Sequence, residues 1–405
     1  MGLTMKDKRV LTKAMCKQYR KARKKVKGQI LDQFVEANGY DRCYARALLR
    51  NHGRRVEVRP GVFLEGDARC PAKRPPHPRT YDSSLLVPLK KLWALTDYIC
   101  GKRLKPALPG LLERLEACKE LRVSKAVRAK LLAISPATID RLLKAERARH
   151  TLKGRSHTKP GTLLKHQIPI RTFADWDDVR PGFFEMDLVG HEGGRAQGDY
   201  CFTLDLTDVD SGWTEQYAVP NKAQIHVFNA LQAIRQRLPF AILGLDSDNG
   251  SEFINDHMRR FCLEEHITFT RARPNRKNDN CYIEQKNWSV VRKFVGYYRY
   301  DTKQECDLLN ELYAALRDYN NFFLTSLKLK EKTRDGARVT RRYHAAQTPY
   351  QRLLDSPHVE PSVKKELKTH YNTLNPAALH RRIQALQKKL GILAARKPQH
   401  KETST

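Results

Sequence analysis

Residues 240–253 have the sequence FAILGLDSDNGSEF, and they decide how the surrounding chain is interpreted. The stretch begins with an almost continuous apolar run, which is typical of a strand buried on both faces of a sheet. Two aspartates, Asp246 and Asp248, follow where that strand should end. Asn249 and Gly250 then permit a sharp turn into a helix predicted over 251–266. The stretch therefore predicts a buried strand whose end carries acidic side chains.

The segments on either side of this stretch predict the rest of a sheet. The sequence predicts five strands, at about 183–189, 200–208, 213–219, 240–248 and 267–273. It predicts helices over 222–237, 251–266 and 281–298. Strands and helices in this order predict an α/β domain over 181–300, with a mixed five-stranded sheet and helices on its faces.

Three acidic residues of this domain are placed to meet. Asp187 lies in the middle of the first strand, Asp248 at the end of the fourth, and Glu284 in the first turn of the following helix. Carboxylates that converge repel one another, which raises their pKa values. Two Mg²⁺ or Mn²⁺ ions, about 3.5–4 Å apart, remove that conflict and activate an oxygen nucleophile on a phosphodiester. Asp246 is predicted to share the sheet face of Asp248, and it is interpreted as a solvated strand end rather than as a residue that supports the metal ligands. Asp205, Asp208 and Asp210, near the second strand, are interpreted as strand-end and turn residues rather than ligands.

Three motifs resemble a known family. MDLVG (186–190), DSDNGSEF (246–253) and NCYIEQKN (280–287) are similar to the DDE motif of retroviral-type integrases and the related bacterial insertion-sequence transposases. The thirty-five residues between Asp248 and Glu284 match that family's spacing. The resemblance covers about 180–300. It implies an RNase H-like catalytic core that cuts and joins DNA ends, with Asp187, Asp248 and Glu284 as metal-binding catalytic residues.

The composition indicates a nucleic-acid partner. The 405 residues include 76 Lys and Arg but only 44 Asp and Glu, which gives a formal net charge of +32. Each cation that neutralises a phosphate releases a counterion, so DNA is the natural partner for such a surface. An anionic membrane surface is the alternative, but no basic amphipathic stretch supports it, and no apolar run is long enough to span a membrane.

The cysteines indicate a reducing compartment. There are nine, an odd number, and none form a C-x-x-C pair, which predicts reduced thiols in a cytoplasmic, nucleoid-associated protein. No apolar signal-peptide segment is present at the N-terminus. Retroviral integrases carry an N-terminal His/Cys zinc site. Here the nearest candidates lack ligand-pair spacing, so no zinc is predicted: Cys43, His52, Cys70 and His77.

Two helix-turn-helix units are predicted before the α/β domain. In the first, Asn38-Gly39 separates two helical segments within 28–53, and a plain helical hairpin is the alternative. In the second, Ser124 and Ser135 are predicted helix caps, with Pro136 in a first turn. These units would replace the zinc module and bind specific DNA sequences.

Several basic or polar residues are candidates for DNA contacts. Some lie on the second helix-turn-helix unit, some in the polar loop before Glu284, and some on the helix that Glu284 begins. Asn287 is one turn after Glu284 and is expected either to orient it or to contact DNA. The full set is Arg141, Lys144, Arg147, Arg273, Arg276, Lys277, Asn287, Arg292 and Lys293.

The C-terminal third predicts a small DNA-binding module and helices. Basic residues around Asp335-Gly336 predict a β-hairpin over 326–344. Leu379, Ile383, Leu386 and Leu390 predict an amphipathic helix over 376–395, which either packs in the core or pairs with a second protomer.

The predicted organisation is multidomain, with all-α DNA-binding units, an α/β core, and a C-terminal β module with helices. Its parts are a basic arm with the first helix-turn-helix unit (1–58), a linker (59–82), the second unit (83–150), a basic connector (151–180), the catalytic core (181–300), a helical extension (301–325), the basic β module (326–347), C-terminal helices (348–395) and a disordered tail (396–405).

The predicted activity is that of a transposase or integrase. Such an enzyme binds element ends, cuts their 3′ ends with two Mg²⁺ or Mn²⁺ ions and joins them to target DNA. At least a dimer on DNA is expected, because two ends must be paired. The alternatives are a non-catalytic DNA-binding repressor and an RNase H-like nuclease. The sequence leaves open whether an ATPase helper is required.

Overall fold

The computed structural model describes residues 3–66, 80–150, 180–195, 197–247, 253, 256–271, 283, 286–336 and 338–397. The chain divides into two compact units, Met1–Thr80 and Tyr81–Thr405. The predicted connector at 151–180, apart from Arg180, and the tail from residue 398 lie outside the described residues.

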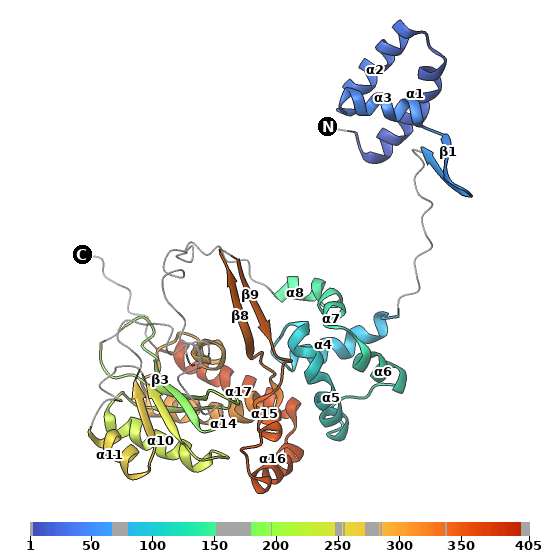
Figure 1. The fold of residues 1–405 in the computed structure, drawn as a ribbon. Helices are drawn as coiled ribbons and strands as arrows, with labels where there is room; N and C mark the ends of the chain where they lie inside the picture. The colour runs from blue at the N-terminus through green and yellow to red at the C-terminus, as the bar shows by residue number, and fades with distance from the viewer. Residues whose placement is uncertain are drawn as a thin grey trace, which may run out of the picture. The chain divides into compact units, whose positions relative to one another are not determined.

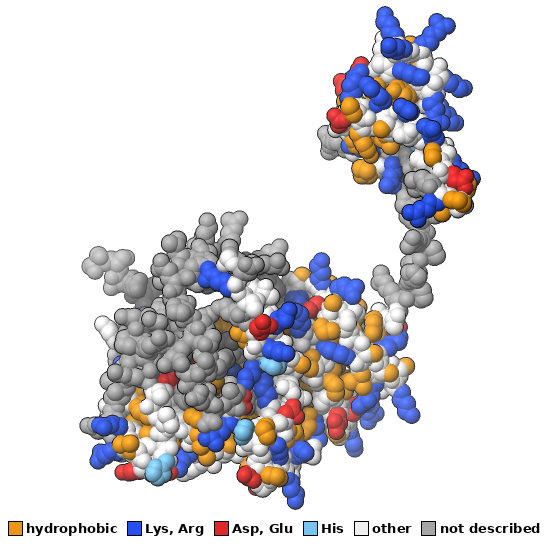
Figure 2. Space-filling view, in the orientation of Figure 1, with side chains coloured by type: hydrophobic (Ala, Val, Ile, Leu, Met, Phe, Trp, Pro, Cys, Tyr) orange, Lys and Arg blue, Asp and Glu red, His pale blue; other side chains and the backbone are white. Residues whose placement is uncertain are grey.

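The first unit is a three-helix bundle followed by a hairpin. Its elements are α1 (Met5–Lys21), α2 (Lys24–Asn38), α3 (Arg42–Asn51), β1 (Arg54–Arg59) and β2 (Val62–Gly66). Phe34 and Leu49 are fully buried in a core that all three helices share. Gly39 ends α2 with a positive φ of 67°, and the carboxylate of Asp41 caps α3. Figure 2 shows Lys and Arg side chains over the visible surface of this unit.

The structure adds one detail to the predictions for this unit and corrects another. The basic arm is helical, because residues from Met5 onward form α1 and bury Cys16 in the bundle. The predicted linker at 59–82 begins inside a β-hairpin, since β1 and β2 pair antiparallel from Arg54 to Gly66. Gly61, with a φ of 75°, allows the tight turn between these two strands.

The second unit begins with helices. They are the short 3₁₀ segment η1 (Ser83–Leu85), α4 (Leu86–Ala94), α5 (Gly101–Ala117), α6 (Lys125–Ala133), α7 (Pro136–Leu142) and α8 (Lys144–His150). The predicted caps are confirmed, because the hydroxyl of Ser124 accepts from Val127 N and that of Ser135 accepts from Thr138 N.

These helices do not form a separate core. Leu104 and Leu112 of α5 share one hydrophobic cluster with Trp213, Phe322 and Tyr350. The C-terminal helices complete it, and they are α14 (Lys303–Phe323), α15 (Pro349–Asp355), α16 (Pro361–Thr373) and α17 (Pro376–Ala395) (Figure 1). The helical region that precedes the α/β domain is therefore packed with the helices that follow it.

A mixed five-stranded sheet is confirmed. Its strands are β3 (Phe183–Gly190), β4 (Phe202–Asp208), β5 (Thr214–Val219), β6 (Gly244–Ser247) and β7 (Thr268–Arg271), in the order β5-β4-β3-β6-β7. β3 is central, antiparallel to β4 and parallel to β6. Strand β6 is shorter than predicted. Its ladder with β3 begins only at Gly244, because the carbonyl of Gly182 instead accepts from Leu243 N and Gly244 N.

The two faces of the sheet differ in polarity. Phe184, Met186 and Leu245 lie on one face and pack against α10 (Gln224–Arg237) and α11 (Asp256–Glu264). The other face carries Glu185 and Asp187, which alternate with those apolar residues along β3. Helix α14 covers part of the polar face, where the amide of Asn321 bonds both backbone groups of Thr214.

The predicted amphipathic helix is α17, and it packs within the chain. Ile383, Leu386 and Leu390 are buried in one cluster with Leu312 of α14, and Leu379 packs against a second cluster. The coiled-coil alternative for this stripe is therefore not adopted here. After α17, the ammonium of Lys397 bonds Asp301 (2.6 Å) and Glu305 (2.7 Å).

The predicted hairpin is present as β8 (Leu329–Asp335) and β9 (Arg338–Tyr343), which pair antiparallel and project from the unit (Figure 1). Within the described part of the chain, no helix is long and apolar enough to cross a membrane. The seven cysteines in that part all carry free thiols.

Candidate active site

The strand register brings four carboxyl side chains to the polar face of the sheet. Asp187 on β3 lies opposite Asp205 on β4, and Glu185 lies beside Asp246 on β6. Directly opposed residues have Cβ atoms about 4.5–5.5 Å apart, so these acidic groups are near neighbours. The centre of the sheet is therefore acidic in a chain whose net charge is +32.

Two hydrogen bonds attach the segment around residue 284 to β3. The amide Nδ2 of Asn287 donates to Asp187 Oδ2 (2.6 Å), and the backbone N–H of Ile283 donates to Glu185 Oε2 (2.9 Å). Asn287 begins a π-helical segment, η3 (Asn287–Arg292), which continues into α13 (Lys293–Val295). The chain is thus fixed to the acidic strand on both sides of Glu284, which itself lies outside the described residues.

Asp205 was expected to be a strand-end or turn residue, and that expectation is wrong. It lies in the middle of β4, fully buried, where Gln216 Nε2 (2.9 Å) and Thr214 Oγ1 (3.2 Å) donate to its Oδ1. Burial raises the pKa of Asp205, hydrogen bonds and Lys286 lower it, and the neighbouring Asp187 raises it further. Its other oxygen, Oδ2, accepts no hydrogen bond from the described residues.

Lys286 supplies the positive charge for this cluster. Its ammonium is enclosed, although part of the side chain reaches the surface, and it donates to the carbonyl of Gly212 (3.1 Å). Burial lowers the pKa of Lys286, and attraction to Asp205 opposes that shift. A buried cation beside opposed carboxylates offsets their repulsion. Sequence reasoning missed Lys286, although its position two residues after Glu284 on a basic-polar segment was a usable signal.

Asp246 was expected to be a solvated strand end, and this is also wrong. Only 5% of it is exposed, and the hydroxyl of Thr270 on β7 donates to its Oδ1 (2.7 Å). Burial follows from the sheet order, because β6 has a neighbouring strand on each side. Asp246 therefore belongs to the polar face and not to the surface.

Several predicted site residues cannot be placed. Those outside the described residues are Asp248, Glu284, Arg273, Arg276 and Lys277. Of the three predicted metal ligands, the structure places only Asp187. Its carboxylate fits the predicted role, since it lies on the acidic face and is held by Asn287.

The described DNA-contact candidates fall into two groups. Arg292 donates to the carbonyl of Gly190 (2.6 Å), Lys293 pairs with Asp97, and Arg147 pairs with Asp140 (2.9 Å), so these three make contacts within the protein. Arg141 on α7 and Lys144 at the start of α8 are exposed, and Arg141 also donates to Ala137 O (3.3 Å) and Thr138 Oγ1 (2.9 Å) within its own helix. Asn287 was predicted either to orient Glu284 or to contact DNA. In the structure it donates a hydrogen bond to Asp187 instead.

The donor set suits a hard divalent cation. Carboxylate and amide oxygens are the ligands that Mg²⁺ and Mn²⁺ prefer. The Oδ1 of Asn287, like the Oδ2 of Asp205, is buried and accepts no hydrogen bond from the described residues. No group of three or more His, Cys, Asp or Glu side chains in those residues is arranged to hold a metal ion. A complete site on this face needs ligands from the undescribed positions.

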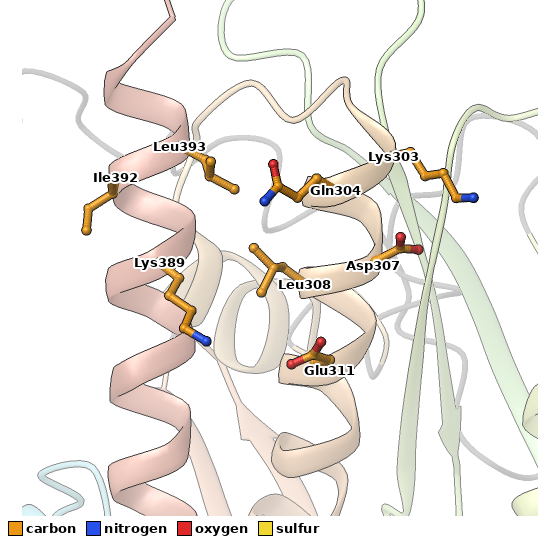
Figure 3. A pocket seen from close by; sticks show the side chains of 8 residues that line it. All are labelled: Lys303, Gln304, Asp307, Leu308, Glu311, Lys389, Ile392 and Leu393. Atoms are coloured by element: carbon orange, nitrogen blue, oxygen red, sulfur yellow. The ribbon is translucent and has the colours of Figure 1, made fainter.

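A groove elsewhere in the unit contains none of the predicted site residues. It has a volume of about 630 Å³ and lies between α14 and α17, lined by residues such as Asp307, Glu311 and Lys389 (Figure 3). The charges of its acidic and basic side chains balance, whereas the sheet face described above is acidic.

His191 is a structural residue, as a lone histidine usually is. It is fully buried, its Nε2 is 2.8 Å from the hydroxyl of Thr203, and its ring meets the edge of Tyr300. Burial, with a contribution from the charge of Arg292, lowers its pKa from 6.5 to about 3. The folded protein therefore keeps His191 neutral where the unfolded chain would protonate it.

This lowered pKa predicts an acid-dependent loss of stability. As the pH falls below about 6.5, only the unfolded state takes up this proton, so stability present above that pH is lost. By about pH 4.5 the loss should reach about 2–3 kcal/mol. Chemical unfolding at several pH values should show a shallower acid dependence for His191→Gln. An unchanged slope in that variant, or an equal change in the exposed-site control His358→Gln, would contradict the assignment.

The fold and the site define the class of this protein, an α/β protein with an acidic sheet face and added helical units. No known family model matches the chain. It belongs to the family of the uncharacterized protein y4rM of Sinorhizobium fredii (strain NBRC 101917 / NGR234). The two are 38% identical over 352 residues, which are 86% of this chain and 96% of that protein.

Solved structures with detectable similarity include retroviral integrase cores. The catalytic core domain of BIV integrase is 19% identical, with a TM-score of 0.30, over 44% of this chain and 96% of that chain. The HTLV-2 integrase catalytic core domain in complex with magnesium is 17% identical, with a TM-score of 0.27, over 36% and 90%. A chain of the simian T-cell lymphotropic virus intasome in complex with PP2A regulatory subunit B56 gamma is 14% identical, with a TM-score of 0.33, over 62% and 76%. Because these TM-scores are low, the similarities assign no activity to this chain.

Proposed function

We propose that the protein is a DNA transposase or integrase that cuts the 3′ ends of an element and joins them to target DNA. The observation that carries the proposal is the acidic face of β3, with its attachment to the residues on both sides of Glu284. Asp187 lies on that face, and Ile283 and Asn287 are bonded to Glu185 and Asp187. Glu284 lies between Ile283 and Asn287 in the sequence, and we propose that its carboxylate acts together with Asp187.

The proposed role of Asp248 rests on the register of the strand before it. Ser247, the residue before Asp248, ends β6 and is in register with Met186, the residue before Asp187. We propose that Asp187, Asp248 and Glu284 together bind two Mg²⁺ or Mn²⁺ ions.

The bound ions would supply the Lewis acidity for phosphodiester cleavage and transfer. The residues of the protein orient the carboxylate ligands and offset their negative charge. Asn287 donates to Asp187 Oδ2, and the backbone N–H of Leu188 donates to Asp187 Oδ1 (2.8 Å), so both oxygens of this carboxylate are oriented. Lys286 offsets the charge of the neighbouring Asp205. The residues in the polar loop, Arg273, Arg276 and Lys277, would bind the phosphates on either side.

The exposed hairpin is proposed to bind DNA along one face. Opposed residues of β8 and β9 share a face, so Arg334 and Val339 lie on one side together with Arg341. Arg342 lies on the other side, where it pairs with Glu331 (3.4 Å). A two-stranded ribbon fits the major groove, and an isolated hairpin is only marginally stable without a partner.

The hairpin predicts a difference between two adjacent arginines. Arg341→Ser should weaken binding to duplex DNA several-fold and reduce the slope of log Kd against log salt by about 1, because one phosphate contact is lost. Arg342→Ser should change both quantities less, since its charge is already paired. Fluorescence anisotropy over a salt series measures this, and equal effects of the two variants would count against the assigned face.

A strand-transfer assay tests the proposed activity. Pre-nicked DNA from the flanks of the gene would be mixed with plasmid and Mg²⁺ or Mn²⁺, using wild type and Asp248→Asn. Joined product from wild type alone supports a recombinase and locates its ends. Tight binding to the flanks without joining in either metal would favour a DNA-binding repressor. Cleavage of the DNA without joining would favour a nuclease.

A further inference from the structure

Three large aromatic side chains are exposed on the segment that follows Asn287. Trp288, Tyr297 and Tyr298 are 59%, 69% and 57% exposed. Tryptophan is highly buried on average in folded proteins, so an exposed one beside a candidate site needs an explanation. Trp288 directly follows Asn287, whose amide bonds Asp187.

The backbone that carries Trp288 is firmly held. Val290, Val291 and Val295 on the same helical segment are buried, and the last two belong to the core shared with α14 and α17. The N–H of Lys293 bonds the carbonyl of Trp288, five residues back, which is π-helical geometry. Such turns are frequent at functional sites. The indole is therefore presented outward from a fixed support, and among the described residues it makes no aromatic or cation–π contact.

The charge around Trp288 selects the partner. Residues 285–300 include four Lys or Arg and no Asp or Glu. The guanidinium of Arg292 lies 4.9 Å from the ring centre of Tyr297. Each of these cations has a partner within the protein, so they make the surroundings positive without serving as free phosphate ligands. An exposed aromatic side chain in positive surroundings favours single-stranded nucleic acid, because bases stack on the ring.

We propose that Trp288 stacks on an unpaired base at the DNA end, next to the phosphodiester that is cut. This inference rests on the proposed function, since it supplies the step that opens the duplex there. Base pairs at the end must separate before the backbone can reach a site on the sheet face. An indole on the fixed segment next to Asn287 would lower the cost of that separation by replacing lost base stacking.

A binding comparison tests the proposal without requiring cleavage. The probes are a blunt 30-base-pair duplex and the same duplex with two mismatched pairs at one end, measured in Ca²⁺ by anisotropy. Wild type should bind the frayed end about tenfold more tightly than the blunt end. Trp288→Ala should lose this preference, whereas Trp288→Phe, which keeps an aromatic face, should retain most of it. Leu263→Ala removes a similarly exposed apolar side chain from α11 and should leave the preference unchanged.

The outcomes separate this inference from the proposed function. An equal preference in wild type and Trp288→Ala, or none in wild type, overturns the stacking role. Altered self-association of Trp288→Ala in sedimentation, with the DNA preference intact, would make the aromatic surface a protein interface and also overturns it. The protein could instead show a frayed-end preference that depends on Trp288 but join no DNA in either metal. That result would support the stacking role and contradict the proposed recombinase activity.

Discussion

Asp187→Asn should abolish metal-dependent cleavage and strand transfer, with a loss of about 10³-fold or more. Asp187 is the predicted metal ligand that the structure places, and a ligand carboxylate contributes several kcal/mol of transition-state stabilisation through its ion. The asparagine side chain has the same shape but no negative charge. Its amide can rotate so that its oxygen accepts the hydrogen bond from Asn287. DNA binding should be retained, because the positive surfaces are unchanged.

The same substitution should not destabilise the fold. Asp187 raises the pKa of Asp205, which means that the two carboxylates repel each other. Removing one charge relieves that repulsion, so the unfolding temperature of Asp187→Asn should equal or exceed that of wild type. Asp210→Asn is the matched control, since it loses only the partner of Lys328. Full joining activity in Asp187→Asn would exclude Asp187 as a ligand.

Lys286→Met should reduce both stability and activity. The variant leaves Asp205 without its nearby cation and Gly212 without its donor. Breaking a buried charge interaction is strongly destabilising, and because these two charges form no direct ion pair we expect a loss of about 2–3 kcal/mol. Joining activity should fall at least tenfold at a temperature where the variant remains folded, because the segment that carries Glu284 loses an attachment to the sheet.

Two further variants separate the charge effect from lost packing. Lys293→Met removes a lysine from the same helical segment, where it pairs with Asp97 near the surface, and should cost less than about 1 kcal/mol. Combining Lys286→Met with Asp205→Asn should recover part of the stability, because the uncompensated charge is gone. Urea unfolding measures all three. No recovery in the double variant would mean that the ammonium acts only through Gly212.

Features that depend on local sequence pattern, such as strands and helix starts, could be predicted from the sequence. The apolar pattern placed Asp187 within the first strand of the sheet, and Ser135 with Pro136 marked the start of α7. It was not sufficient for what depends on register and sheet order. Asp205 joins the site because β4 pairs antiparallel with β3 at that residue, and no local signal fixes such a pairing.

Helix phase accounts for the other omissions. A regular α-helix starting near residue 281 puts Asn287 on the face of Glu284, but it does not say that Lys286 turns inward against Gly212. The π-helical geometry of η3 changes the angular spacing of these side chains. Asp246 was misjudged for a different reason, because its burial depends on β7, a strand that comes more than twenty residues later.

The single core that joins α5 to the C-terminal helices has a consequence for biosynthesis. The cluster around Leu104 and Leu112 is complete only when Phe322 and Tyr350, more than two hundred residues further along, have been synthesised. Contacts between such distant parts slow folding and leave apolar surface uncovered while the ribosome is still working. A message that ends before the C-terminal helices therefore yields a chain whose helical core is open, which favours chaperone capture or degradation.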